Sequence, residues 1–218
     1  MKLEMLKHEY EGKLITFCGL DGCGKTTQMK HLAKWLENNG YQVYLTKQPT
    51  DFVRQSEIFR TYMDTPEHDA YDYRALSLLC ASDRVQHSNK VISQKLKEGC
   101  IVISDRYFYS CLANLMARGF QEDMWIYEVA KSIPQPDVAF FLNVPVEEAI
   151  ERVRKRPEEK DKFIDVPLQK QLHDLYVSIA RENGGVVVST MLPEDTCFER
   201  ILLEVKRNIV KENSGDMK

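Results

Sequence analysis

The sequence lacks an excess of basic residues. Its 218 residues include 30 Lys and Arg against 33 Asp and Glu, which gives a formal net charge of −3. Proteins that bind nucleic acids normally carry a surplus of positive charge, because contacts to phosphate supply much of their affinity. We therefore predict that nucleic acid is not a partner.

Long apolar runs are also missing. The first eleven residues contain five charged side chains, namely Lys2, Glu4, Lys7, Glu9 and Glu11. This start differs from the apolar core of a secretory signal, and no later stretch is long and apolar enough to cross a bilayer. The six cysteines form no C-x-x-C pair and no cluster with metal-ligand spacing. We expect reduced thiols and a cytoplasmic protein without a membrane partner.

A phosphate-binding pattern is present. Residues 19–27 match G-x-x-x-x-G-K-[ST], between an apolar, β-branched run at 14–18 and an amphipathic stretch at 26–38. A strand, a glycine loop and a helix in this order direct backbone N–H groups toward a phosphate. The predicted ATP-binding residues are Gly19, Gly22, Cys23, Gly24, Lys25, Thr26 and Thr27.

The chemistry of this loop assigns individual roles. Lys25 supplies a positive charge for the β- and γ-phosphates, and Thr26 offers a hydroxyl to Mg²⁺. A later apolar run, 100–104, is followed by Asp105, at the position expected of a carboxylate at a Mg²⁺ site. Thr26 and Asp105 are therefore the predicted metal ligands. The alternative for Asp105 is a structural pair with Arg106 that caps the loop.

Predicted strands and helices alternate along the chain. The strands are expected at 14–18, 41–46, 100–104, 137–144 and 186–189. The helices are expected at 26–38, 52–63, 65–84, 86–98, 109–118, 123–131, 147–156, 168–182 and 193–210. Thr65 is the predicted N-cap of the third helix, with Pro66 in its first turn. This alternation predicts an α/β fold in which helices cover both faces of a parallel sheet.

The domain boundaries follow from the same pattern. Residues 1–12 form a polar lead-in, residues 13–210 a single domain, and residues 211–218 a tail that we expect to be disordered.

Four segments together resemble bacterial thymidylate kinases. They are residues 19–28, 78–87, 105–113 and 142–156, and their spacing also matches that family. The resemblance extends over about residues 13–210. It implies a P-loop NTPase fold with three α/β/α layers, a five-stranded parallel sheet of order 2-3-1-4-5 and a small lid at about 152–166. It also implies ATP as phosphate donor, a nucleoside monophosphate as acceptor, with dTMP as the default, and a homodimer.

The resemblance assigns further site residues. The acceptor-binding positions are Asp21, Lys47, Cys80, Arg84, Arg106 and Asn114. Among them, Arg106 would bind the acceptor phosphate, Arg84 the base, and Asp21 the region of the sugar and phosphate. One subclass of the family has glycine at the position of Gly22 and takes its transition-state arginine from the lid, so the predicted catalytic residues are Lys25, Asp105, Arg152, Arg154 and Arg156. Without the phosphate loop, the three lid arginines would be interpreted as a solvated charged face.

The acceptor pocket departs from the family pattern. Cys80 stands where the family has a base-stacking Phe, and Lys47-Gln48-Pro49 stands for Arg-Glu-Pro. Asn114-Leu115 replaces Tyr-Gln, and Asp161-Lys162 replaces Asp-Arg. Loss of one stacking ring costs about 1–3 kcal/mol of binding free energy. These changes therefore predict either that thymine binds more weakly or that the acceptor carries a different base.

Three functions are therefore compatible with the sequence. The first is an ATP-dependent nucleoside monophosphate kinase. The second is a deoxynucleoside kinase, although Asp105-Arg106-Tyr107 differs from the Glu-Arg-Ser usual in that family. The third is a nucleotide-binding regulator without turnover, which the intact Lys25, Thr26 and Asp105 disfavour.

Overall fold

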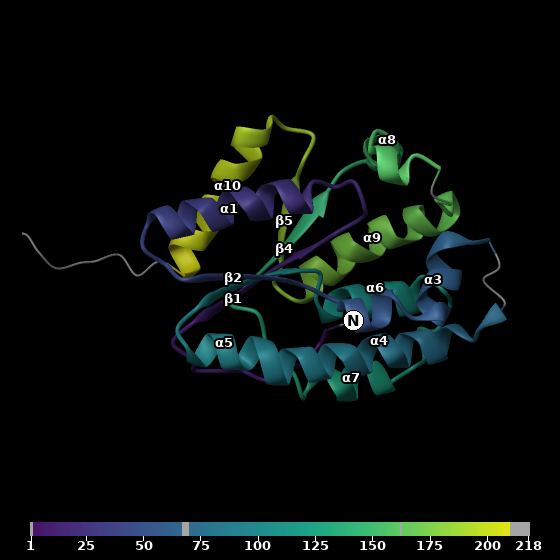
Figure 1. Ribbon diagram of the computed structural model, residues 1–218, viewed down its shortest axis with the longest axis horizontal. Helices are drawn as coiled ribbons and strands as arrows, with labels where there is room; N and C mark the ends of the chain where they lie inside the picture. Colours follow the sequence, from purple (N-terminus) through teal and green to yellow (C-terminus); the bar gives the residue numbers. More distant parts are fainter. Residues whose placement is uncertain (1, 67–69, 162, 210–218) are drawn as a thin grey trace, which may run out of the picture.

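A five-stranded parallel sheet forms the centre of the protein (Figure 1). The computed structural model describes residues 2–66, 70–161 and 163–209. The strands are β1 (Lys13–Cys18), β2 (Val43–Lys47), β3 (Ile101–Asp105), β4 (Val138–Asn143) and β5 (Val186–Ser189). Their spatial order is β2-β3-β1-β4-β5, which confirms the predicted fold and strand order.

Helices cover both faces of this sheet. In Figure 1, α1 (Lys25–Asn38) and α10 (Glu194–Asn208) lie on one side, and further helices lie on the other. These are α4 (Tyr73–His87), α5 (Ser93–Lys97), α6 (Phe108–Met116) and α9 (Val166–Glu182). The central strands β1, β3 and β4 are almost entirely buried, because a parallel sheet between two helical layers presents neither face to water.

Three further helices lie near the carboxyl edge of the sheet, and a fourth packs beside α4. The helices near that edge are α2 (Asp51–Arg54), α3 (Glu57–Asp64) and α8 (Val146–Arg154), and the fourth is α7 (Trp125–Ala130). A short 3₁₀ turn, Pro157–Glu159, follows α8 in the predicted lid. No helix in residues 2–66, 70–161 and 163–209 is long and apolar enough to span a membrane.

Two helix predictions are wrong. The helix expected at 52–63 is two helices, because Ser56 interrupts it and caps α3 by accepting a hydrogen bond from the Phe59 N–H. Thr65 follows the end of α3 instead of beginning the next helix, and α4 begins at Tyr73 with Asp72 as its N-cap. Local capping signals at Thr65 and Pro66 were therefore misleading, since Asp72 supplies the cap that is used.

The predicted break near residue 85 is also absent. The chain remains helical from α4 through a π-helical segment, Ser88–Ile92, into α5. The buried side chains on its inner face continue through Ser88, Ile92 and Leu96, which favours one uninterrupted packed surface.

The ends of the chain add little to the sheet. In the described part of the lead-in, Leu3 and Met5 are buried, and Leu6 forms an isolated parallel bridge with Pro134. The predicted disordered tail, residues 211–218, and the predicted domain end at residue 210 lie outside the described residues.

Candidate active site

The glycine loop joins β1 directly to α1. Gly24 has a φ of 91° and occupies the N-cap position of α1, a left-handed conformation that favours glycine. The Lys25 side chain turns back over the loop, where its Nζ donates to the carbonyl oxygens of Gly19 at 3.2 Å and Leu20 at 2.8 Å. Lys25 is only 6% exposed, so its charge is held at the loop that the sequence predicts to bind phosphate.

The other predicted ATP-binding residues lie in the same loop and first helical turn. Cys23 is fully buried, and its sulfur lies 3.7 Å from Lys25 Nζ. Thr26 is exposed and Thr27 is partly buried at the start of α1. The loop is therefore assembled as the motif predicts, with the Thr26 side chain accessible from outside.

Gly22 is required by a close approach of the lid helix. It has a φ of 82°, and a Cβ built on it would lie 2.2 Å from the carbonyl oxygen of Ala149 in α8. The same Cβ would be 3.1 Å from a side-chain carbon of Val153. A longer side chain at position 22 therefore does not fit while α8 packs on the loop.

Arg106 connects the glycine loop with β3. It has a φ of 66° and is the one non-glycine residue with positive φ in the described part of the chain. This backbone costs about 1–2 kcal/mol, and it is held by a hydrogen bond from the Arg106 N–H to the Phe17 carbonyl at 2.8 Å. The guanidinium donates to Asp21 Oδ1 at 2.6 Å, to the Gly19 carbonyl at 3.1 Å and to Tyr176 Oη at 3.0 Å. Strained backbone of this kind clusters at functional sites.

Asp105 lies beside Arg106 but is not its ion-pair partner. Asp105 ends β3, opposite Phe17 of β1 and Lys47 of β2 in the register of the sheet. Its Oδ1 is buried and has no hydrogen-bond partner, whereas the Arg106 guanidinium pairs with Asp21. The structure therefore gives no support to the alternative of an Asp105–Arg106 staple.

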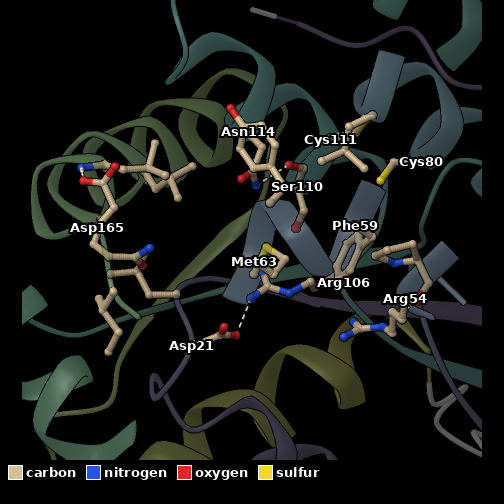
Figure 2. Close-up of a pocket in the computed structure, with 18 of the residues that line it drawn as sticks. Asp21, Arg54, Phe59, Met63, Cys80, Arg106, Ser110, Cys111, Asn114 and Asp165 are labelled. Carbon is tan, nitrogen blue, oxygen red and sulfur yellow. Dashed lines mark hydrogen bonds and ion pairs between the residues drawn. The ribbon is translucent and has the colours of Figure 1, made fainter. Parts of the chain in front are cut away.

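A cavity of about 360 Å³ opens on the other side of Arg106 (Figure 2). Of the predicted acceptor-binding residues, all but Lys47 line it, namely Asp21, Cys80, Arg84, Arg106 and Asn114. Asp105 also lines this cavity. The cavity and the glycine loop thus meet at Asp21 and Arg106.

Lys47 lies outside this cavity. Its ammonium group pairs with Asp51 at 2.6 Å, and the two side chains are 50% and 62% exposed. Arg54, which the sequence analysis did not single out, lines the cavity instead. The Arg54 Nε donates to the Pro49 carbonyl at 2.7 Å, which fixes the side chain across the end of β2.

The electrostatic surroundings of Arg54 are unusual. Burial, followed by the positive charge of Arg106, lowers the pKa of Arg54, and Asp105 and Asp21 act in the opposite direction. Arg84 contributes a further positive charge that lowers this pKa. Arg54, Arg84 and Arg106 therefore lie close enough in one cavity to influence each other's charge, an arrangement that favours an anionic ligand.

A buried network holds the loop that carries Arg54. Gln48 is fully buried and its amide contacts His87 Nδ1 at 3.1 Å and Ser88 Oγ at 3.0 Å. Thr50 donates from its N–H to Asp83 Oδ2 at 2.7 Å. Gln48 thus supports the loop from its buried side. Gln48 stands where the family has Glu, and it does not line the cavity.

Arg84 is the most buried cation of the cavity. It is 3% exposed, and its Nη1 donates to the Cys80 carbonyl at 3.0 Å. The Arg84 Nε is buried and has no hydrogen-bond partner. Burial raises the pKa of the Cys80 thiol to about 11, so this side chain is neutral at neutral pH.

Asn114 is already engaged on the far side of the cavity. Its amide nitrogen donates to the Ser110 carbonyl at 2.8 Å, and its Oδ1 accepts from Arg118 Nη1 at 3.0 Å. Leu115, the next departure from the family pattern, is fully buried in the core.

The three lid arginines occupy different surroundings, and none of them lines the cavity. Arg152 pairs with Glu148 at 2.7 Å and donates to the Thr190 carbonyl at 3.1 Å. Arg156 pairs with Glu159 at 2.5 Å, and Arg154 is exposed at the end of α8. Of the three, Arg152 is linked to the phosphate loop through Thr190, because a Cβ on Gly24 of this loop would lie 3.8 Å from the Thr190 side chain.

These features define a member of one of the P-loop families, in which the phosphate loop and the cavity share Asp21 and Arg106. Comparison with known families gives the particular one. Residues 17–201 match the family model described as thymidylate kinase. The chain belongs to the thymidylate kinase family and is a phosphotransferase.

Individual relatives agree over most of the chain. A probable thymidylate kinase from Thermococcus kodakarensis is 40% identical over 206 residues, which cover 91% of this chain and 99% of the relative. One from Pyrococcus horikoshii is 42% identical over 173 residues, 78% of this chain and 83% of the relative. A third, from Sulfurisphaera tokodaii, is 36% identical over 183 residues, 82% of this chain and 88% of the relative.

We predict that Gly22→Ala is more damaging than Gly40→Ala. Both glycines have φ near +80°, at 82° and 84°, but nothing lies within 4 Å of a Cβ on Gly40. Each substitution costs about 1–2 kcal/mol in left-handed strain, and Gly22→Ala must also displace α8. Urea unfolding and kinase turnover measure the difference. Equal losses of stability and activity in the two variants would show that the α8 contact is unimportant.

Proposed function

We propose that this protein transfers the γ-phosphate of ATP to dTMP, forming dTDP and ADP. The observation that carries this proposal is the junction at Arg106 and Asp21, where the phosphate loop meets a cavity whose lining includes Arg54, Arg84 and Arg106. The relatives' printed names support dTMP as the acceptor, and none supports the deoxynucleoside kinase or the regulator.

In the proposed reaction, an oxygen of the acceptor phosphate attacks the γ-phosphorus of ATP. The bond between this phosphorus and the bridging β,γ-oxygen breaks, and ADP leaves. Phosphoryl transfer asks the protein mainly to position the reactants and to stabilise negative charge. Lys25, held at the loop by the Gly19 and Leu20 carbonyls, would bind the donor phosphates.

Thr26 and Asp105 would hold Mg²⁺. The fit rests on the buried Asp105 Oδ1, which has no hydrogen-bond partner, and on the accessible Thr26 side chain. Oxygen ligands of this type suit Mg²⁺, which commonly binds through one or two protein groups and substrate phosphates. When bound, the metal would neutralise charge on the β- and γ-phosphates.

Arg54 would bind the acceptor phosphate together with Arg106. Arg54 occupies the cavity position that the exposed Lys47 does not reach. Arg106 is already paired with Asp21 at 2.6 Å, so a phosphate arriving there shares or replaces this partner. Arg54 donates only its Nε to the protein, among the hydrogen bonds of the described residues, which leaves its terminal nitrogens for the ligand.

Arg84 would select the acceptor base by donating hydrogen bonds to the edge of the base. A guanidinium only donates hydrogen bonds, so the facing atom must accept. The 4-keto oxygen of thymine or uracil satisfies this requirement, and the 4-amino group of cytosine does not. The buried, unpartnered Arg84 Nε supports a ligand atom at this place.

Arg152 is the lid arginine that we assign to the transferred phosphate. Its contact with Thr190 keeps it beside the start of α1, whereas Arg154 is exposed and Arg156 is paired within the lid.

We also infer a cytoplasmic homodimer. The free thiols of all six cysteines support the compartment, and the family resemblance supports the homodimer.

The acceptor is tested by measuring ADP formation with dTMP, dUMP, dCMP, AMP and thymidine at fixed ATP and Mg²⁺. We expect dTMP to give the highest kcat/KM, dUMP to follow, and thymidine to be inactive because it lacks the phosphate that Arg54 and Arg106 bind. Preferential use of thymidine or of dCMP would contradict the proposal.

Asp105→Asn is predicted to lower turnover by roughly a hundredfold or more. The change removes the negative charge but keeps the shape, so the melting temperature without nucleotide should stay close to that of the wild type. Turnover at saturating substrates and thermal unfolding of the free protein measure the two effects. A large loss of stability with little loss of turnover would favour a structural role.

Arg54→Gln is predicted to raise the KM for dTMP by about 10- to 150-fold, the equivalent of a charge-assisted hydrogen bond of about 1.5–3 kcal/mol. The KM for ATP should not change. Lys47→Ala is the competing assignment, and Arg207→Gln removes an exposed arginine on α10 that pairs with Glu204. Both should change the KM by less than about fivefold, as expected for exposed ion pairs. A larger effect of Lys47→Ala than of Arg54→Gln would reverse the assignment.

A further inference from the structure

We propose that Phe59 of α3 is the ring on which the acceptor base stacks. The inference rests on the proposed function and specifies its base-binding surface. The family resemblance places a stacking Phe at the position of Cys80, which has a small neutral thiol here. Arg84 binds only an edge of the base, so a flat partner for its face must come from elsewhere in the cavity.

Five aromatic side chains line the cavity, namely Phe59, Tyr62, Tyr73, Phe163 and Tyr176. Tyr73 and Tyr62 are occupied by each other, with ring centroids 5.0 Å apart. The Arg118 guanidinium also lies 4.1 Å from the Tyr73 ring centroid and 5.0 Å from that of Tyr62. These two rings therefore form a closed stack with a cation of the protein.

The other two rings are also engaged. Tyr176 is buried, accepts a hydrogen bond from Arg106 at 3.0 Å and donates one to Ser110 Oγ at 3.1 Å. Phe163 already interacts with another part of the protein. It lies two residues before Asp165, which Figure 2 shows on the opposite side of the cavity from Cys80. Neither ring is available on the side of Cys80 and Arg84.

Phe59 remains available. It is partly buried, and its ring has no aromatic or cationic partner among the described residues. In the view of Figure 2, its ring lies between Cys80 and Arg54, beside Met63. This location is between the proposed phosphate partner and the position of the missing family ring.

The backbone of Phe59 is held in place. Ser56 caps α3 by accepting from the Phe59 N–H at 3.4 Å, and its hydroxyl donates to the Val53 carbonyl at 2.7 Å. Val53 is fully buried, so the cap connects Phe59 to the packed part of α2. A platform that is positioned before the ligand arrives spends less free energy on ordering.

The segment after β2 therefore carries two functions that the family motif places elsewhere. Arg54 takes the place of Lys47 at the phosphate, and Phe59 takes the place of the ring lost at Cys80. A neighbouring phenylalanine, Phe52, gives a natural comparison, since it lies on α2 with 78% of its surface exposed and does not line the cavity.

The test compares wild-type protein with Phe59→Ala, Phe59→Leu, Phe59→Tyr and Phe52→Ala in the full chain. The KM for dTMP is measured for each, together with the inhibition constant of 2-deoxyribose 5-phosphate, which carries the phosphate but no base. Phe59→Ala and Phe59→Leu should raise the KM for dTMP by about 5- to 150-fold, as expected for a lost stack. The inhibition constant of 2-deoxyribose 5-phosphate should not change.

The ring-preserving Phe59→Tyr and the control Phe52→Ala should both stay within about twofold of wild type in the KM for dTMP. Phe59→Leu keeps an apolar side chain, so it decides the question if Phe59→Ala does not fold. The inference is wrong if Phe59→Leu leaves the KM within about twofold of wild type, or if it weakens 2-deoxyribose 5-phosphate as much as dTMP. Failure of the proposed function is seen separately, as absence of dTMP turnover in the wild type.

Discussion

The site depends on the pairing of β1 with β3, which brings the carboxyl ends of these two strands together. Phe17 stands opposite Asp105 in this register, and the Phe17 carbonyl then accepts the N–H of Arg106. This hydrogen bond holds Arg106 in its left-handed conformation and directs the guanidinium to Gly19 and Asp21. The phosphate loop and the cavity therefore share one fixed boundary, across which we propose that the phosphoryl group moves.

The lid helix imposes a second constraint on the same loop. Gly22 leaves no room for a side chain under Ala149, so α8 packs directly on the phosphate loop. Position 22 therefore has no room for an arginine, and a transition-state arginine from the lid stays a prediction. Arg152 reaches the Thr190 carbonyl from α8, and the Thr190 side chain would lie 3.8 Å from a Cβ on Gly24 of the phosphate loop.

Most of the fold could be predicted from the sequence, because its signals are local. The glycine loop and the apolar runs identify the strands of a parallel sheet, and the order of those strands came from the family resemblance. The helix boundaries between residues 52 and 97 could not be predicted reliably. Thr65 and Pro66 carry strong capping signals that tertiary packing does not use, and the π-helical segment at Ser88–Ile92 has no comparable sequence pattern.

The residues that line the cavity could be predicted only where they belong to a sequence motif. Cys80, Arg84 and Arg106 lie in segments with a family pattern and do line the cavity, although their roles stay predictions. Arg54 and Phe59 were missed, because α2 and α3 show only an ordinary amphipathic pattern. Lys47 was chosen from its position in the motif, but alternation along β2 turns its side chain toward solvent. Only the structure shows that a residue seven positions later, Arg54, reaches the cavity.

We propose that a dTMP cavity and an ATP loop face each other across Arg106. The most direct test is a crystal structure with a compound that joins adenosine to thymidine through a chain of phosphates. We predict thymine between Phe59 and Arg84, the adjoining phosphate at Arg54 and Arg106, and the remaining phosphates in the loop around Lys25. Thymidine bound outside the cavity, with only the adenosine half ordered at the loop, would contradict it.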